Sequence, residues 1–264
     1  MTDSVLVSTD ERGIALVTMH RPERHNAFDG AMIRALDAAV AEFENDARVR
    51  VIVLTGSGKS FCSGADLGHM SAMLQATEQA NYEDALGLAR LLRRLAECDK
   101  PLIARVNGNA FGGAVGLIAC ADVTIAVTSA QFALSEVRLG LVPATISPYV
   151  VDAIGARAAK RLTLTGERFG TDVALGLGLV HVAAEPDRLD ETVEAQIGLL
   201  LAGGPLAQAE AKRLFRRLCG LDARAAGAQE IETARLLARI RVGDEAQEGM
   251  AAFLGKRKPH WSRS

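Results

Sequence analysis

"NGNAFGGAVGLIACAD", residues 107–122, holds four glycines in an apolar run that carries no charge before Asp122. A β-branched strand is predicted just before it, over residues 102–106, and an apolar helix just after Gly112-Gly113. The first N–H groups of a helix have no intrahelical acceptor and lie at the positive end of its dipole. The segment therefore predicts a glycine turn that presents a backbone donor to a ligand, with close packing of a buried helix as the alternative.

Strand, glycine turn and helix recur around this segment, which is typical of a layered α/β core. A second turn, Gly64-Ala65-Asp66, also leads into a short helix and leaves N–H donors free. A β-hairpin is predicted at the start of the chain. The predicted strands are residues 5–7, 14–19, 51–54, 102–106 and 123–127, and the first predicted helix is 31–43.

The chain changes character near Asp187, where Ala- and Leu-rich stretches are patterned as amphipathic helices over residues 190–201, 207–218 and 230–240. We therefore expect an α/β core over residues 1–190 and a helical region over 191–264. Because a helical segment with an apolar face often packs on a second subunit, we expect self-association.

Composition excludes several classes of protein. The 264 residues are 49% hydrophobic, and 30 Lys and Arg balance 32 Asp and Glu, so nucleic acid is not expected as a partner. The longest uncharged apolar run, residues 110–121, is too short to span a bilayer, and no signal-peptide pattern is present at the start. We expect a cytoplasmic protein with no membrane association.

The cysteines and histidines show no metal-site spacing. Four cysteines lack a CxxC pair, and the five histidines form no HxH or HxxxH pattern, so no metal site is predicted. Cys62 is expected to be a core or pocket thiol with no paired base, and not a nucleophile.

Glu136 is the candidate acid/base. It stands in "AQFALSEVRLGLVP", residues 130–143, among apolar neighbours that would raise its carboxyl pKa towards neutral pH. The alternative is a plain ion pair with Arg138.

The ordered set of motifs resembles the crotonase superfamily, the enoyl-CoA hydratase and isomerase group, over nearly the whole chain. The resemblance implies a spiral of repeated ββα units, a C-terminal helical region that forms trimers or hexamers, and coenzyme A thioester substrates. The motifs are "HRPERHNAF" (20–28), "SFCSGADL" (60–67), "NGNAFGGAVGL" (107–117), "AQFALSEVRLGLVP" (130–143), "LTGERF" (164–169) and "EGMAAFLGKRKPHW" (248–261).

The resemblance also implies roles. The N–H groups of Ala65 and Gly113 would hold the thioester oxygen as it becomes an enolate, and Glu136 would transfer the proton. Hydratases with two glutamates carry the other one at the position of Gly116. The resemblance thus implies an enoyl-CoA hydratase with one acid; a double-bond isomerase and a non-catalytic acyl-CoA-binding or RNA-binding relative are the alternatives.

The run "SEVRLGLVPATISPYV", residues 135–150, resembles bacterial hydratases of leucine and acyclic-terpene breakdown. Their substrates, 3-methylglutaconyl-CoA and isohexenylglutaconyl-CoA, carry a carboxylate. On this resemblance, Gly116 would leave space and remove a repelling charge in the pocket, and Arg138 would pair with the substrate carboxylate.

Coenzyme A enters as part of the substrate, and no separate cofactor is expected. By resemblance its contacts would come from the start of the chain, from the turn after Gly64 and from the C-terminal region. The implied residues are Arg24, Ala27, Ala65, Asp66, Leu67, Gly68, Phe253 and Lys256.

Overall fold

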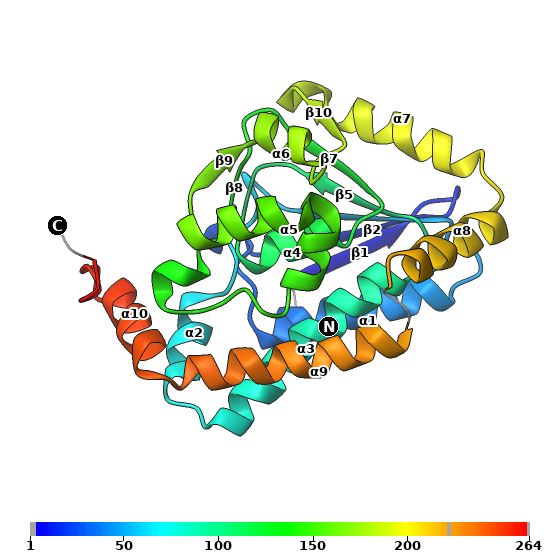
Figure 1. Cartoon of the computed structure of the whole chain (residues 1–264). Helices are drawn as coiled ribbons and strands as arrows, with labels where there is room; N and C mark the ends of the chain where they lie inside the picture. The colour runs from blue at the N-terminus through cyan, green and yellow to red at the C-terminus, as the bar shows by residue number, and fades with distance from the viewer. Residues whose placement is uncertain (1–3, 221–222, 263–264) are drawn as a thin grey trace.

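Two β-sheets form the centre of the computed structural model, which describes residues 4–220 and 223–262 (Figure 1). The strands are β1 (Val5–Thr9), β2 (Ile14–Met19), β3 (Val51–Gly56), β4 (Ser60–Cys62), β5 (Leu102–Val106), β6 (Asn109–Phe111), β7 (Val123–Val127), β8 (Gln131–Ala133), β9 (Arg168–Gly170) and β10 (Val182–Ala184). The helices are α1 (Gly30–Asn45), α2 (Leu67–Leu74), α3 (Glu78–Glu97), α4 (Gly113–Ala119), α5 (Ser147–Thr165), α6 (Thr171–Leu177), α7 (Leu189–Leu201), α8 (Pro205–Leu218), α9 (Ala223–Arg241) and α10 (Asp244–Leu254). Short 3₁₀ helices are η1 (Pro22–Arg24), η2 (Glu136–Leu139) and η3 (Pro186–Arg188).

The sheets confirm the predicted ββα repeat. The larger sheet has the order β1-β2-β3-β5-β7-β10 and is parallel except for the β1–β2 hairpin. The smaller sheet has the order β4-β6-β8-β9, with β4, β6 and β8 parallel. Each repeat thus places its first strand (β3, β5, β7) in one sheet and its second (β4, β6, β8) in the other, and a helical segment follows.

The core explains why these strands were visible in the sequence. All six residues of β3 are buried, as expected for a parallel strand covered on both faces. On α1, the predicted stripe that includes Ile33, Leu36 and Phe43 is buried on one side of the helix. Burying side chains of this kind contributes about 1.5–3 kcal/mol each.

The C-terminal region is helical, as predicted from residue 190 onward. In Figure 1, α9 runs along α3, and α10 packs on α2 and η2, so the end of the chain reaches the core. In contrast, α8 has no buried residue and exposes Leu206, Phe215 and Leu218. The division at residue 190 and self-association through this region stay predictions.

None of the described helices combines the length and the apolar character that a membrane span requires.

Candidate active site

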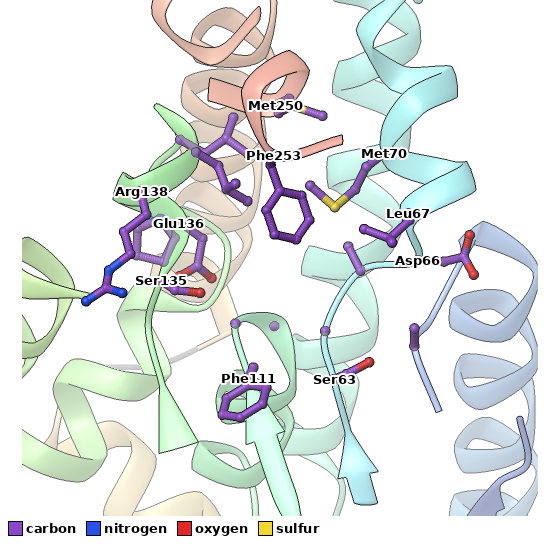
Figure 2. Close-up of a pocket in the computed structure, with 18 of the residues that line it drawn as sticks. Ser63, Asp66, Leu67, Met70, Phe111, Ser135, Glu136, Arg138, Met250 and Phe253 are labelled. Carbon is purple, nitrogen blue, oxygen red and sulfur yellow. The ribbon is translucent and has the colours of Figure 1, made fainter. Parts of the chain in front are cut away.

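Three neighbouring strands of the smaller sheet end at one edge. Because β4, β6 and β8 are parallel and paired, the segments that follow them come together there. Those segments carry Ala65, Gly113 and Glu136. Figure 2 shows Ser63, Phe111 and Glu136 from these strand ends around one cavity. Ligands in α/β proteins commonly bind outside the carboxyl ends of parallel strands.

The Ala65 N–H is free because of how its segment pairs. Phe28 and Ala65 form an isolated parallel bridge, in which Phe28 N donates to Gly64 O and Asp66 N donates to Phe28 O, both at 2.9 Å. The intervening N–H of Ala65 has no acceptor among the described residues. Gly64 has φ 92°, and a Cβ there would lie 2.9 Å from Phe111 O, so the turn is packed directly on β6.

Gly113 supplies the second free donor. It is the first residue of α4, so its N–H has no partner inside the helix, and no other described residue accepts from it. Gly112 takes φ 56° and ψ −126°, a conformation open only to glycine, and a Cβ there would lie 3.2 Å from Glu136 Oε1. A Cβ on Gly113 would lie 2.5 Å from Phe28 Cζ. The glycines therefore serve close packing and leave a donor free.

Glu136 begins η2, and its carboxyl group is enclosed. Its Oε2 is buried without a hydrogen-bond partner, and burial raises the pKa of Glu136 to about 7. The expected alternative, an ion pair with Arg138, is not formed in the described chain, since Arg138 donates to Thr165 O at 3.4 Å. A carboxyl group with this pKa exchanges a proton readily near neutral pH.

Protein stability should depend on pH through Glu136. Between its ordinary pKa of 4.5 and the raised value near 7, the folded protein holds a proton that the unfolded chain has lost, so stability falls as the pH rises through this window. Glu136→Gln removes this loss. We therefore expect Glu136→Gln to raise the free energy of unfolding relative to the wild type, and to do so by roughly 2 kcal/mol more at about pH 8 than at about pH 5. Urea unfolding at the two pH values measures this difference. The same difference at both pH values would contradict this.

The cavity has a volume of about 740 Å³ and combines the two donors with an apolar wall. Met70, Leu67 and Phe253 border it opposite Glu136 in Figure 2. Cys62 is confirmed as a core thiol: it is fully buried, and burial raises its pKa to about 12, so it is not a nucleophile.

The prediction that Gly116 leaves space in the pocket is wrong. Gly116 is buried in α4 and does not border the cavity, and a Cβ there would overlap Ile146 Cγ2. Ile146 precedes α5 and fills the volume that a second acidic side chain would need. The position beside Gly116 is thus closed by an apolar side chain.

The expectation for Arg138 also needs correction. Part of Arg138 borders the cavity, but the residue is exposed and its side chain packs on Gly166. Figure 2 shows its guanidinium turned away from the cavity. The reason is local: the one-turn η2 helix directs Glu136 inward and Arg138 outward. Arg138 is therefore not positioned to pair with a substrate carboxylate inside the cavity.

Most of the residues expected to contact coenzyme A lie around the cavity. Those that border it are Arg24, Ala27, Ala65, Asp66, Leu67 and Phe253. Gly68 and Lys256 do not border it. The Gly68 N–H is already taken by Asp66 Oδ1 at 2.8 Å, as part of the cap of α2. Arg257, the residue after Lys256 in the basic run near the end of the chain, borders the cavity and pairs with Glu248 at 2.6 Å.

A charged cluster at the cavity was not predicted from the sequence. His69 from α2 and Arg241 from α9 both border the cavity, and both contact Asp84 of α3. Asp84 lies 15 positions after His69 and 157 before Arg241, so no local pattern joins the three residues. The only local sign in the sequence is that each of the three lies four residues from an apolar side chain, which is Met73, Leu88 or Leu237.

Known proteins of similar sequence and fold match nearly the whole chain. The family model described as enoyl-CoA hydratase/isomerase matches residues 9–264. Among curated proteins, the chain is similar to the short-chain-enoyl-CoA hydratase of Clostridium acetobutylicum, with 33% identity over 250 residues that cover 94% of each chain.

Solved structures show the same fold. An enoyl-CoA hydratase from Shewanella pealeana superposes with a TM-score of 0.80 and 40% identity, covering 98% of this chain and 96% of that one. An enoyl-CoA hydratase from Mycobacterium avium superposes with a TM-score of 0.87 and 33% identity, covering 99% and 100%.

Proposed function

Since the chain belongs to the enoyl-CoA hydratase/isomerase family, we propose that it adds water across the 2,3 double bond of an acyl-CoA thioester. One observation carries the proposal. Ala65 and Gly113, whose backbone N–H groups have no acceptor among the described residues, border the same cavity as Glu136, whose Oε2 is buried. This set matches what enolate chemistry needs: donors for a developing oxyanion and a nearby acid/base.

The proposed reaction uses Glu136 twice. Ionised Glu136 takes a proton from water as the water oxygen bonds to C3, and the electron pair of the double bond moves towards the thioester. The resulting enolate oxygen accepts hydrogen bonds from Ala65 and Gly113, which are fixed in a largely apolar cavity and stabilise this charge by several kcal/mol. Protonated Glu136 then gives the proton to C2, and the carbonyl is restored.

The closed position at Gly116 supports a mechanism with one acid. Ile146 occupies the space beside Gly116, so the proposed site has no second carboxyl group at that position. A pKa near 7 suits Glu136 to this double role, because both of its protonation states are populated near neutral pH.

For the substrate we propose a branched or carboxylated enoyl-CoA such as 3-methylglutaconyl-CoA. The motif over residues 135–150 supports this through its resemblance to hydratases of such esters. Ile146, which borders the cavity and fills the space that a side chain at position 116 would need, adds to the support, since no carboxylate stands at that position to repel an acidic acyl group.

A double-bond isomerase is the second candidate, because a single acid/base can also move a proton from C2 to C4. Incubation of 2-enoyl and 3-enoyl thioesters in water labelled with heavy oxygen distinguishes the two reactions. We expect the label in a 3-hydroxyacyl product, and none with Glu136→Gln. Conversion of the 3-enoyl to the 2-enoyl ester without incorporation of label would contradict the hydratase and favour the isomerase.

A further inference from the structure

Three helices, α2, α3 and α9, each contribute a charged or titratable residue to one cluster beside the cavity. His69 Nε2 of α2 lies 2.7 Å from Asp84 Oδ1 of α3, and Arg241 Nη1 of α9 lies 2.6 Å from Asp84 Oδ2. The side chain of His69 is only 19% exposed, that of Asp84 13% and that of Arg241 16%. Asp84 thus holds two cationic groups in place in a largely buried setting.

The cluster still has donors to offer. Both oxygens of Asp84 are engaged, but His69 Nδ1 and the Nε and Nη2 of Arg241 have no partner among the described residues. Unlike Glu136 Oε2, these atoms are not fully buried, so they are accessible to a hydrogen-bond acceptor. Because His69 and Arg241 border the cavity and Asp84 does not, the cluster presents donors to the cavity and no free acceptor.

An apolar layer lies beside these donors. Met73 is four residues after His69 on α2, and Leu237 is four residues before Arg241 on α9. Leu88 likewise follows Asp84 by four residues on α3, and all three apolar side chains border the cavity. Since residues four apart share a helix face, the wall changes from apolar to cationic within one helical turn.

We propose that Arg241 and His69 bind a carboxylate at the far end of the acyl group. With His69 protonated, His69 and Arg241 share the one negative charge of Asp84, and Asp29, whose charge also acts on His69, is itself paired with Arg21, so an anionic group would complete the charge balance of the cluster. Asp84 acts as a positioning residue for both cations. This carboxylate site rests on the hydratase function proposed above, because it assumes that an acyl-CoA thioester occupies the cavity.

Electrostatics favours the cationic form of His69. The hydrogen bond to Asp84 raises the pKa of His69 above its ordinary value, against the opposing effects of burial and of the Arg241 charge. The cluster also takes the role that the sequence analysis gave to Arg138, whose guanidinium lies outside the cavity.

Binding of two saturated esters tests the proposal without the reaction. Glutaryl-CoA and pentanoyl-CoA have the same chain length and differ in the terminal carboxylate. By calorimetry we expect wild-type protein to bind glutaryl-CoA about tenfold more tightly, and Arg241→Gln to abolish this preference. Arg241→Lys, which keeps the charge, should retain part of it. Arg239→Gln, an exposed position on the same helix, is the matched control and should retain all of it.

Two results would overturn the proposal: no preference for glutaryl-CoA in the wild type, or the same preference in Arg241→Gln. An equal loss of affinity for both esters would also overturn it, because Arg241 would then serve the coenzyme A moiety or the fold. If Arg241→Gln does not fold in a urea titration, His69→Ala, which keeps the Asp84–Arg241 ion pair, takes its place. Wild-type protein that shows the preference but does not hydrate glutaconyl-CoA would contradict the proposed hydratase and leave this inference standing.

Discussion

Glu136→Gln is expected to lower kcat for hydration by about 10³-fold or more, the largest effect of any single side chain in this site. Glutamine preserves the shape of the side chain but neither takes a proton from water nor gives one to C2. Ile146 closes the position beside Gly116, and Asp66, the other carboxylate of the described residues that borders the cavity, is paired with Arg21 and Arg24, so we expect no other acid to substitute for Glu136. Steady-state kinetics with a 2-enoyl-CoA measures the loss.

The control is Glu167→Gln, a partly exposed glutamate that pairs with Arg161 and does not border the cavity, and its kcat should equal that of the wild type. Acyl-CoA affinity of Glu136→Gln should stay close to that of the wild type, which separates a chemical defect from a binding defect. If Glu136→Gln kept activity within about tenfold of the wild type, Glu136 would not be the acid/base of the reaction.

The second large effect is expected from removing the Gly113 N–H. Gly113→Pro deletes this donor at the first position of α4, where a helix tolerates proline. Gly112 before it has φ and ψ that mirror polyproline values, so the local backbone suits a following proline. Loss of one oxyanion donor should lower kcat by about 10²–10³-fold.

Gly113→Ala is the matched control, because it adds a Cβ at the same place but keeps the N–H. Both variants are made in a Phe28→Leu background, since the added Cβ would lie 2.5 Å from Phe28 Cζ. The ratio of kcat between the alanine and proline variants then reports the donor alone. Equal kcat values in the two variants would show that the Gly113 N–H does not stabilise the transition state.

Strands were predictable where the sequence has a clear β-branched run with turn residues at both ends. β5 and β7 match the sequence predictions at both ends, because β-branched runs are bounded there by turn residues. The short strands of the smaller sheet, such as β4 and β6, were not predicted, since three residues carry too little periodicity. The ββα repeat came from the family resemblance.

The backbone donors were predictable, and the pocket wall was not. Gly112-Gly113 is visible as a glycine turn before a helix, whereas Ile146 reaches Gly116 from thirty residues further along the chain. A sequence pattern shows that the acid is absent at Gly116, but only packing shows what fills the space. The error at Arg138 is of the same kind, because the direction of a side chain depends on the one-turn helix that carries it.

The most direct test of the central claim is a crystal structure of the protein with acetoacetyl-CoA, a thioester that does not undergo hydration. We predict that the thioester oxygen lies about 2.7–3.1 Å from the N atoms of both Ala65 and Gly113, with the Glu136 carboxyl group beside C2 and C3. A thioester oxygen that contacts neither amide, or a Glu136 side chain turned into solvent, would contradict the account.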